Sequence, residues 1–188
     1  QEEDAEFVNR HGFSKHSPAL PLYTREDALN CLGRLRAHAF GQSFEPVPGW
    51  RVSFTRAGHI LGAASVLLEV AGKRLLFSGD LGRQRDSIMH PPAAAAGAHA
   101  IFIESTYGDR LHPPEGIEAD LAAALQRLAE RGGVAVVPVF AVGRAQALLH
   151  VIANLKAQQL IPPSLPVFLD SPMAVNTTGL MARHMADH

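Results

Sequence analysis

The feature that most constrains the fold is a pair of apolar segments joined by two turn residues. SVLLEV (65–70) and KRLLFS (73–78) flank Ala71–Gly72, and a two-residue loop between such segments is typical of a β-hairpin. A further strand is predicted just upstream, at WRVSFTRA (50–57). The first half of the chain is therefore predicted to be rich in strands with short turns.

A helix is predicted upstream of these strands. Thr24 with Asp27 three positions later is typical of a capping box, and apolar residues from Ala28 to Leu35 follow at helical spacing.

The second half has a different hydrophobicity pattern, in which continuously apolar segments alternate with amphipathic ones. Continuous apolar strands are typical of parallel sheets that are covered on both faces. The alternation predicts an α/β fold with a parallel sheet, and a boundary near residues 108–115. Strands are expected at 99–105, 134–140 and 165–172, and helices at 116–131 and 143–158.

Composition excludes several classes of protein. The formal net charge is −1, so a nucleic-acid site must be a local patch. The single Cys31 excludes an internal disulfide and indicates a reducing compartment, hence a cytoplasmic location. No apolar segment is long enough to span a membrane, so no membrane partner is expected.

Three candidate site residues follow predicted strands. His59, Asp80 and Glu104 each lie at the carboxyl end of such a strand, beside glycine or turn residues. His59 is either a histidine satisfied by a backbone carbonyl or a metal ligand. Asp80 is either a turn-capping residue or a ligand whose two oxygens bridge metals. Their repetition favours one shared site at an edge of the sheet.

A phosphate site is a further hypothesis. Gly143 and Arg144 open a predicted helix, whose N-terminus attracts phosphate, and Arg144 adds a bidentate donor. The alternative is an ordinary strand–helix turn with an exposed arginine.

Five motifs occur in order along the chain: AGHILGAAS, FSGDLGR, ESTYGDR, PVFAVGRAQALL and FLDSPMA. Together they resemble the β-CASP branch of the metallo-β-lactamase superfamily, which contains RNA-processing nucleases. The resemblance implies an α/β fold in which part of a metallo-β-lactamase αββα sandwich (1–110) precedes the start of a parallel-sheet β-CASP domain (111–188).

The resemblance also implies roles for individual residues. His59 is expected to bind one zinc ion, Asp80 to bridge two Zn²⁺ and take part in catalysis, and Glu104 to orient a catalytic histidine near the leaving group. RNA is the implied partner, with Gly143, Arg144, Tyr107 and Ser171 as candidate RNA-binding residues.

One family motif is missing from this sequence. None of the ten histidines shows the H-x-H-x-D-H spacing that supplies most zinc ligands in the family. We therefore expect the chain to be the middle of a longer protein, inactive by itself and with zinc absent or only partly bound. We also expect it to self-associate, for instance as a homodimer, unless the longer chain covers its apolar face.

Two other functions stay open. A small-molecule hydrolase of the glyoxalase or lactamase type would use the same sandwich, although the helix-rich segment after residue 110 argues against it. A non-catalytic β-CASP scaffold subunit would keep the fold, although the presence of His59, Asp80 and Glu104 argues against that.

Overall fold

The computed structural model describes residues 1–111 and 117–188, except for the side chain of Ile117. Half of the predicted boundary at 108–115, residues 112–115, lies outside the described residues. The described chain forms two compact units, 1–38 and 39–188. None of its helices is long and apolar enough to cross a membrane.

The first unit consists of helices α1 (Glu2–His11) and α2 (Arg25–Leu32). The predicted capping box is confirmed, because the Thr24 hydroxyl accepts from the N–H of Asp27 and the Asp27 carboxylate accepts from the N–H of Thr24. The helix ends before Leu35, since Gly33 follows its last residue.

The second unit begins with a five-stranded mixed sheet in the order β1-β2-β3-β4-β5. The first four strands form an antiparallel meander, and β5 pairs parallel to β4. The predicted hairpin is confirmed, because Val70 pairs with Lys73 across Ala71–Gly72, whose φ angles are 48° and 70°. The strands are β1 (Ser43–Val47), β2 (Trp50–Arg56), β3 (Ala64–Val70), β4 (Lys73–Phe77) and β5 (Ala100–Phe102).

One face of the sheet is apolar and largely uncovered. Phe54, Val66, Phe77 and Phe102 form a row across four strands. The rings of Phe77 and Phe102 stack with centroids 4.6 Å apart, yet the two residues are 37% and 55% exposed.

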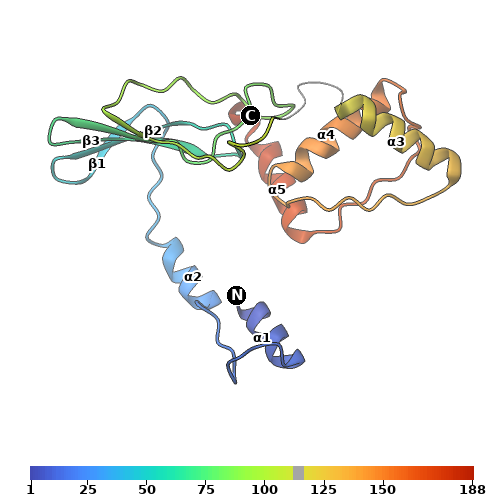
Figure 1. The fold of residues 1–188 in the computed structure, drawn as a ribbon, viewed down its shortest axis with the longest axis horizontal. Coiled ribbons are helices and arrows are strands. Elements are labelled where there is room, and N and C mark those ends of the chain that lie inside the picture. The colour runs from blue at the N-terminus through green and yellow to red at the C-terminus, as the bar shows by residue number, and fades with distance from the viewer. Residues whose placement is uncertain (112–116) are drawn as a thin grey trace. The chain divides into compact units, whose positions relative to one another are not determined.

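The helical part, whose ribbon is drawn in Figure 1, has a small core of its own. Leu125 of α3 and Leu155 of α4 are buried together with Ile161, which follows α4. Both predicted helices are therefore present with their apolar sides inward. The helices are α3 (Ile117–Arg131), α4 (Arg144–Ala157) and α5 (Pro172–Arg183), followed by the short 3₁₀ helix η1 (Met185–Asp187).

Two predicted strands are wrong. Segments 134–140 and 165–170 are extended but form no strand, and residues 172 onwards already belong to α5. Val136 and Phe168 are each 87% exposed. A parallel pair needs flanking strands and packed cover to be stable, and within the described residues neither segment has a partner strand, while the exposure of these side chains shows that little packs against them.

The fold class is therefore α/β. The sheet is mixed and lies within residues 43–102, and the described part of the second half does not form the predicted parallel sheet.

Candidate active site

Three strands end at the same edge of the sheet. Both β2 and β4 run antiparallel to β3, and β5 runs parallel to β4, so β2, β4 and β5 point in one direction. His59, Asp80 and Glu104 follow these three strands. The topology thus places all three candidate residues at one edge, which we call the strand-end edge.

The loops that carry His59 and Asp80 are in direct contact. The N–H of Gly82 donates to the carbonyl of Ala57 at 2.8 Å, and Gly58 forms a β-bridge with Leu81. A Cβ at position 82 would collide with the carbonyl of Gly58. Only glycine therefore allows the two loops to approach this closely.

Glycine is also required at position 58, for two reasons. Its φ is +71°, and a Cβ there would lie 2.5 Å from the carbonyl oxygen of His90. The backbone before His59 is thus fixed by conformation and by sterics.

Glu104 is bonded to the loop that carries Asp80. Its Oε1 accepts from the N–H of Leu81 at 2.9 Å, and its Oε2 accepts from the N–H of Thr106 at 3.3 Å. The carboxylate therefore connects the residue after Asp80 with the chain beyond β5.

These contacts change the acidity of Glu104. The hydrogen bond from Leu81 lowers the pKa of this carboxyl most, and the bond from Thr106 lowers it further. When it is protonated, His59 lowers the pKa of Glu104 as well, but this is the smallest of the causes.

Ser78 is a residue that sequence reasoning missed. It is 7% exposed, and its hydroxyl accepts from the N–H of Glu104 at 2.9 Å and donates to the carbonyl of Gly79 at 2.7 Å. Its carbonyl accepts from the hydroxyl of Ser65 at 2.7 Å. A small polar residue just before the Gly79–Asp80 turn was the available signal.

His59 and Asp80 are both exposed. Their side chains are therefore accessible to a ligand. Within residues 1–111 and 117–188, however, no group of three or more His, Cys, Asp or Glu side chains is placed to hold a metal ion.

The Gly143–Arg144 turn lies near the loop after His59. A Cβ at Gly143, whose φ is +79°, would lie 3.1 Å from Cγ2 of Ile60. Arg144 is exposed at the first position of α4. The glycine thus permits close packing beside the strand-end edge.

The other two candidate RNA-binding residues have local structural partners. The Ser171 hydroxyl accepts from the N–H of Ala174 at 3.2 Å and caps α5. Tyr107 is 54% exposed in the turn after Glu104, where its carbonyl accepts from the N–H of Arg110 at 3.0 Å.

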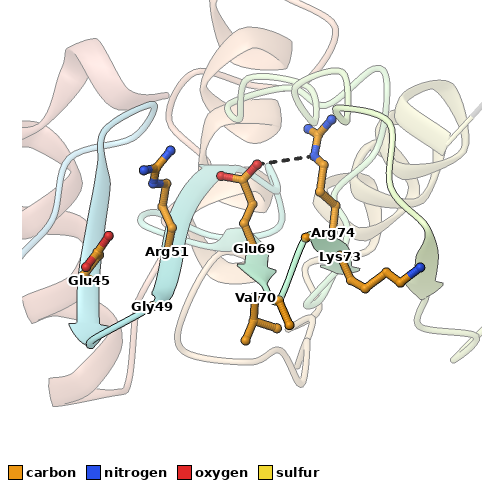
Figure 2. Close-up of a pocket in the computed structure, with 9 residues that line it drawn as sticks. Glu45, Gly49, Arg51, Glu69, Val70, Lys73 and Arg74 are labelled. Carbon is orange, nitrogen blue, oxygen red and sulfur yellow. Dashed lines mark ion pairs between the residues drawn. The ribbon is translucent and has the colours of Figure 1, made fainter.

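The opposite end of the sheet holds a separate pocket, at the β3–β4 hairpin (Figure 2). The dashed line marks the 3.6 Å ion pair between Arg74 Nε and Glu69 Oε1. None of the predicted site residues lines this pocket. Acidic and basic side chains alternate there across β1 to β4, as Glu45, Arg51, Glu69 and Arg74.

Known proteins resemble this chain over most of its length. Ribonuclease TTHA0252 of Thermus thermophilus is 34% identical over 164 residues, which cover 87% of this chain and 37% of that protein. Cleavage and polyadenylation specificity factor subunit 3 of Dictyostelium discoideum is 31% identical over 85% of this chain and 21% of its own length. Endoribonuclease ysh1 of Schizosaccharomyces pombe is 34% identical over 81% and 20%.

The predicted resemblance to the β-CASP RNA nucleases is confirmed. No protein-family model matches the chain, so the relationship rests on these relatives. The chain spans less than two fifths of the length of each β-CASP relative named above.

Proposed function

We propose that this chain is part of a metal-dependent hydrolase that cleaves phosphodiester bonds in RNA. The observation that carries the proposal is the position of His59, Asp80 and Glu104 after β2, β4 and β5, which end at the same edge, where Glu104 also accepts from the N–H of the residue after Asp80. Relatives that are named ribonucleases support RNA as the substrate.

The finer fold assignment is part of the same proposal. Residues 1–110 would belong to a metallo-β-lactamase domain of αββα architecture, and residues 111–188 to the beginning of a β-CASP domain. The exposed apolar row on the sheet supports this, because a second sheet is the kind of element that covers such a face.

The metal is proposed to be zinc, with His59 and Asp80 as ligands. Imidazole and carboxylate are donor types that zinc takes in hydrolases, where it generates hydroxide from bound water. The residues that the structure describes do not supply three such donors at one point, so the donor set fits in kind but is incomplete. We therefore assign no catalytic step to a metal in this chain.

Two carboxylates at the edge would have different tasks. The exposed Asp80 has its oxygens available to a cation, and we propose it as the bridging and catalytic carboxylate. Glu104 already accepts two hydrogen bonds, and we propose that it keeps this charged form while supporting the site. The lowered pKa keeps Glu104 ionised to a lower pH than an ordinary glutamate.

RNA is proposed to lie across the N-terminus of α4. The exposed guanidinium of Arg144 and the Gly143 turn would bind backbone phosphates. Tyr107 and Ser171 would border the same path, Tyr107 through its exposed ring.

A cytoplasmic location and a homodimer are predictions, and sedimentation of the purified protein tests the second.

The test is RNA cleavage by the protein at its full natural length. Asp80→Asn keeps the shape of the side chain and removes its charge, so activity should fall by roughly 100-fold or more. Asp120→Asn, on the exposed side of α3, is the matched control and should retain activity. The 188-residue chain alone should neither cleave RNA nor retain zinc on dialysis.

Three outcomes would contradict the proposal. Full activity of Asp80→Asn would remove Asp80 from the site. Hydrolysis of lactams or thioesters without RNA cleavage would favour a small-molecule hydrolase. Absence of any hydrolysis by the full-length protein would favour a scaffold subunit.

A further inference from the structure

Gln146 is an unusually buried polar side chain in the helical part. It is 6% exposed and lies in the first turn of α4, three residues after Gly143. A carboxamide this deeply buried is tolerated when its donors and acceptor are all satisfied. Its partners therefore show what the side chain holds in place.

One set of partners lies in the turn before α4. Oε1 of Gln146 accepts from the N–H of Gly143 at 2.8 Å, and Nε2 donates to the carbonyl of Ala141 at 3.1 Å. These bonds fix the turn at Gly143, whose φ is +79°. The turn leads directly into Arg144.

The other partners lie on α5. Nε2 also lies 3.2 Å from the carbonyl oxygen of Ala174 and 3.1 Å from the hydroxyl oxygen of Thr178. Because Nε2 has only two N–H donors for these two acceptors and the carbonyl of Ala141, at least one donor is shared. The Thr178 hydroxyl itself donates to the carbonyl of Ala174 at 2.8 Å. Ala145 and Ala174 are 2% and 1% exposed, so the two helices pack closely at this point.

We propose that Gln146 is a positioning residue for RNA binding, which holds the Gly143–Arg144 turn against the first turns of α5. This inference rests on the proposed function. Gln146 is too buried to touch RNA and acts through Arg144, the exposed residue that directly follows the Gly143 turn. A carboxamide is needed, because one group must accept from an N–H and also donate to several oxygens.

The experiment measures RNA binding and cleavage by the full-length protein with Gln146→Met, which keeps the length of the side chain but removes its hydrogen bonds. The KM for RNA should rise about tenfold, as expected when one charge-assisted phosphate contact is lost, with kcat nearly unchanged. Arg144→Ala should have the same effect. The double variant should have the same KM as Arg144→Ala, because the two changes remove the same phosphate contact.

Two further variants control for folding. Gln158→Met makes the same change at the exposed far end of α4, and its KM should equal that of the wild type. Thr178→Val removes one of the four contacts of Gln146 and should raise KM about threefold in a folded protein. If Gln146→Met does not fold, Thr178→Val takes its place: its KM is measured alone and in combination with Arg144→Ala.

Several results would overturn the inference. Additive effects of Gln146→Met and Arg144→Ala, or an unchanged KM in a folded Gln146→Met or Thr178→Val protein, would show that Gln146 only stabilises the fold. An unchanged KM in Arg144→Ala would also overturn it. The Asp80→Asn experiment then still decides separately whether the protein cleaves RNA.

Discussion

The sheet and the two extended segments that flank α4 contain similar residues in different surroundings. In the sheet, each of β2 and β3 has a hydrogen-bonded neighbour on both sides, and two-residue turns join β1 to β2 and β3 to β4. Segments 134–140 and 165–170 are also rich in valine and phenylalanine, but they form no ladder. The difference shows that an apolar segment forms a strand only where a hydrogen-bonded partner strand is available.

Contact distance along the chain and the presence of an existing sheet together explain which segments form strands. β5 pairs in parallel with β4 across residues 78–99, because β4 already belongs to the antiparallel meander. The β3–β4 pair closes across two residues, whereas segments 134–140 and 165–170 must meet across the whole of α4. Local pairs lose little loop entropy, while parallel pairs need further strands to be stable. The strand-end edge is therefore built on the more locally determined part of the molecule.

Hydrogen exchange should give the largest difference between these regions. Backbone amides in the centre of β3, such as that of Leu68, should be protected by roughly 1,000-fold or more, because they open only when the sheet unfolds. The amide of Val136 should exchange close to the rate of an unstructured peptide. Mass spectrometry on the 188-residue chain measures both, and strong protection across 134–140 would contradict the distinction.

Substitution of Gly82 by alanine should give the next largest effect. The added Cβ would collide with the carbonyl of Gly58, so the two loops must separate. We expect a loss of about 3 kcal/mol in the free energy of unfolding. Urea unfolding followed by fluorescence of Trp50, the single tryptophan, measures the change in the sheet itself.

Gly97→Ala is the control for this prediction. No atom lies within 4 Å of a Cβ at Gly97, so its effect should stay within about 0.5 kcal/mol. Equal effects of the two substitutions would mean that the contact between the loops is not a constraint.

The smallest expected effect concerns pH and Glu104. In the folded chain the pKa of this carboxyl lies below its ordinary value of 4.5, so the folded state binds a proton less readily than the unfolded state. The stabilisation is therefore fully present above pH 4.5 and is lost as the pH falls through the lowered pKa.

Glu104→Gln should remove this part of the pH dependence, because the amide carries no charge at any pH. Unfolding free energies of wild type and variant should differ most above pH 4.5 and converge in acid. Glu130→Gln, exposed on α3, is the matched substitution away from the edge. Parallel pH profiles for wild type and Glu104→Gln would contradict the role of the Leu81 hydrogen bond.

Local signals in the sequence predicted local structure well. The capping box at Thr24, the hairpin at Ala71–Gly72 and the apolar sides of α3 and α4 each depend on residues a few positions apart. The shared edge of His59, Asp80 and Glu104 was also expected, and the strand directions place the three residues there. Their chemical roles are still predictions.

Features that depend on distant partners were missed or wrong. The strand pattern at 134–140 says nothing about whether both faces of that strand will be covered. The buried Gln146 looked like an ordinary helical residue, because its bonds to Ala174 and Thr178 cross a long stretch of chain. Ser78 was missed for the same reason, since its bond to Glu104 joins two strands.

The approach of Gly82 to Gly58 has a consequence for mutational scanning. A screen that scores activity alone would rank position 82 beside the metal-binding candidates, although glycine has no side chain with which to do chemistry. Intolerance to substitution at this edge therefore reports missing space as readily as it reports a reacting group, and a parallel screen for abundance is needed to tell the two apart.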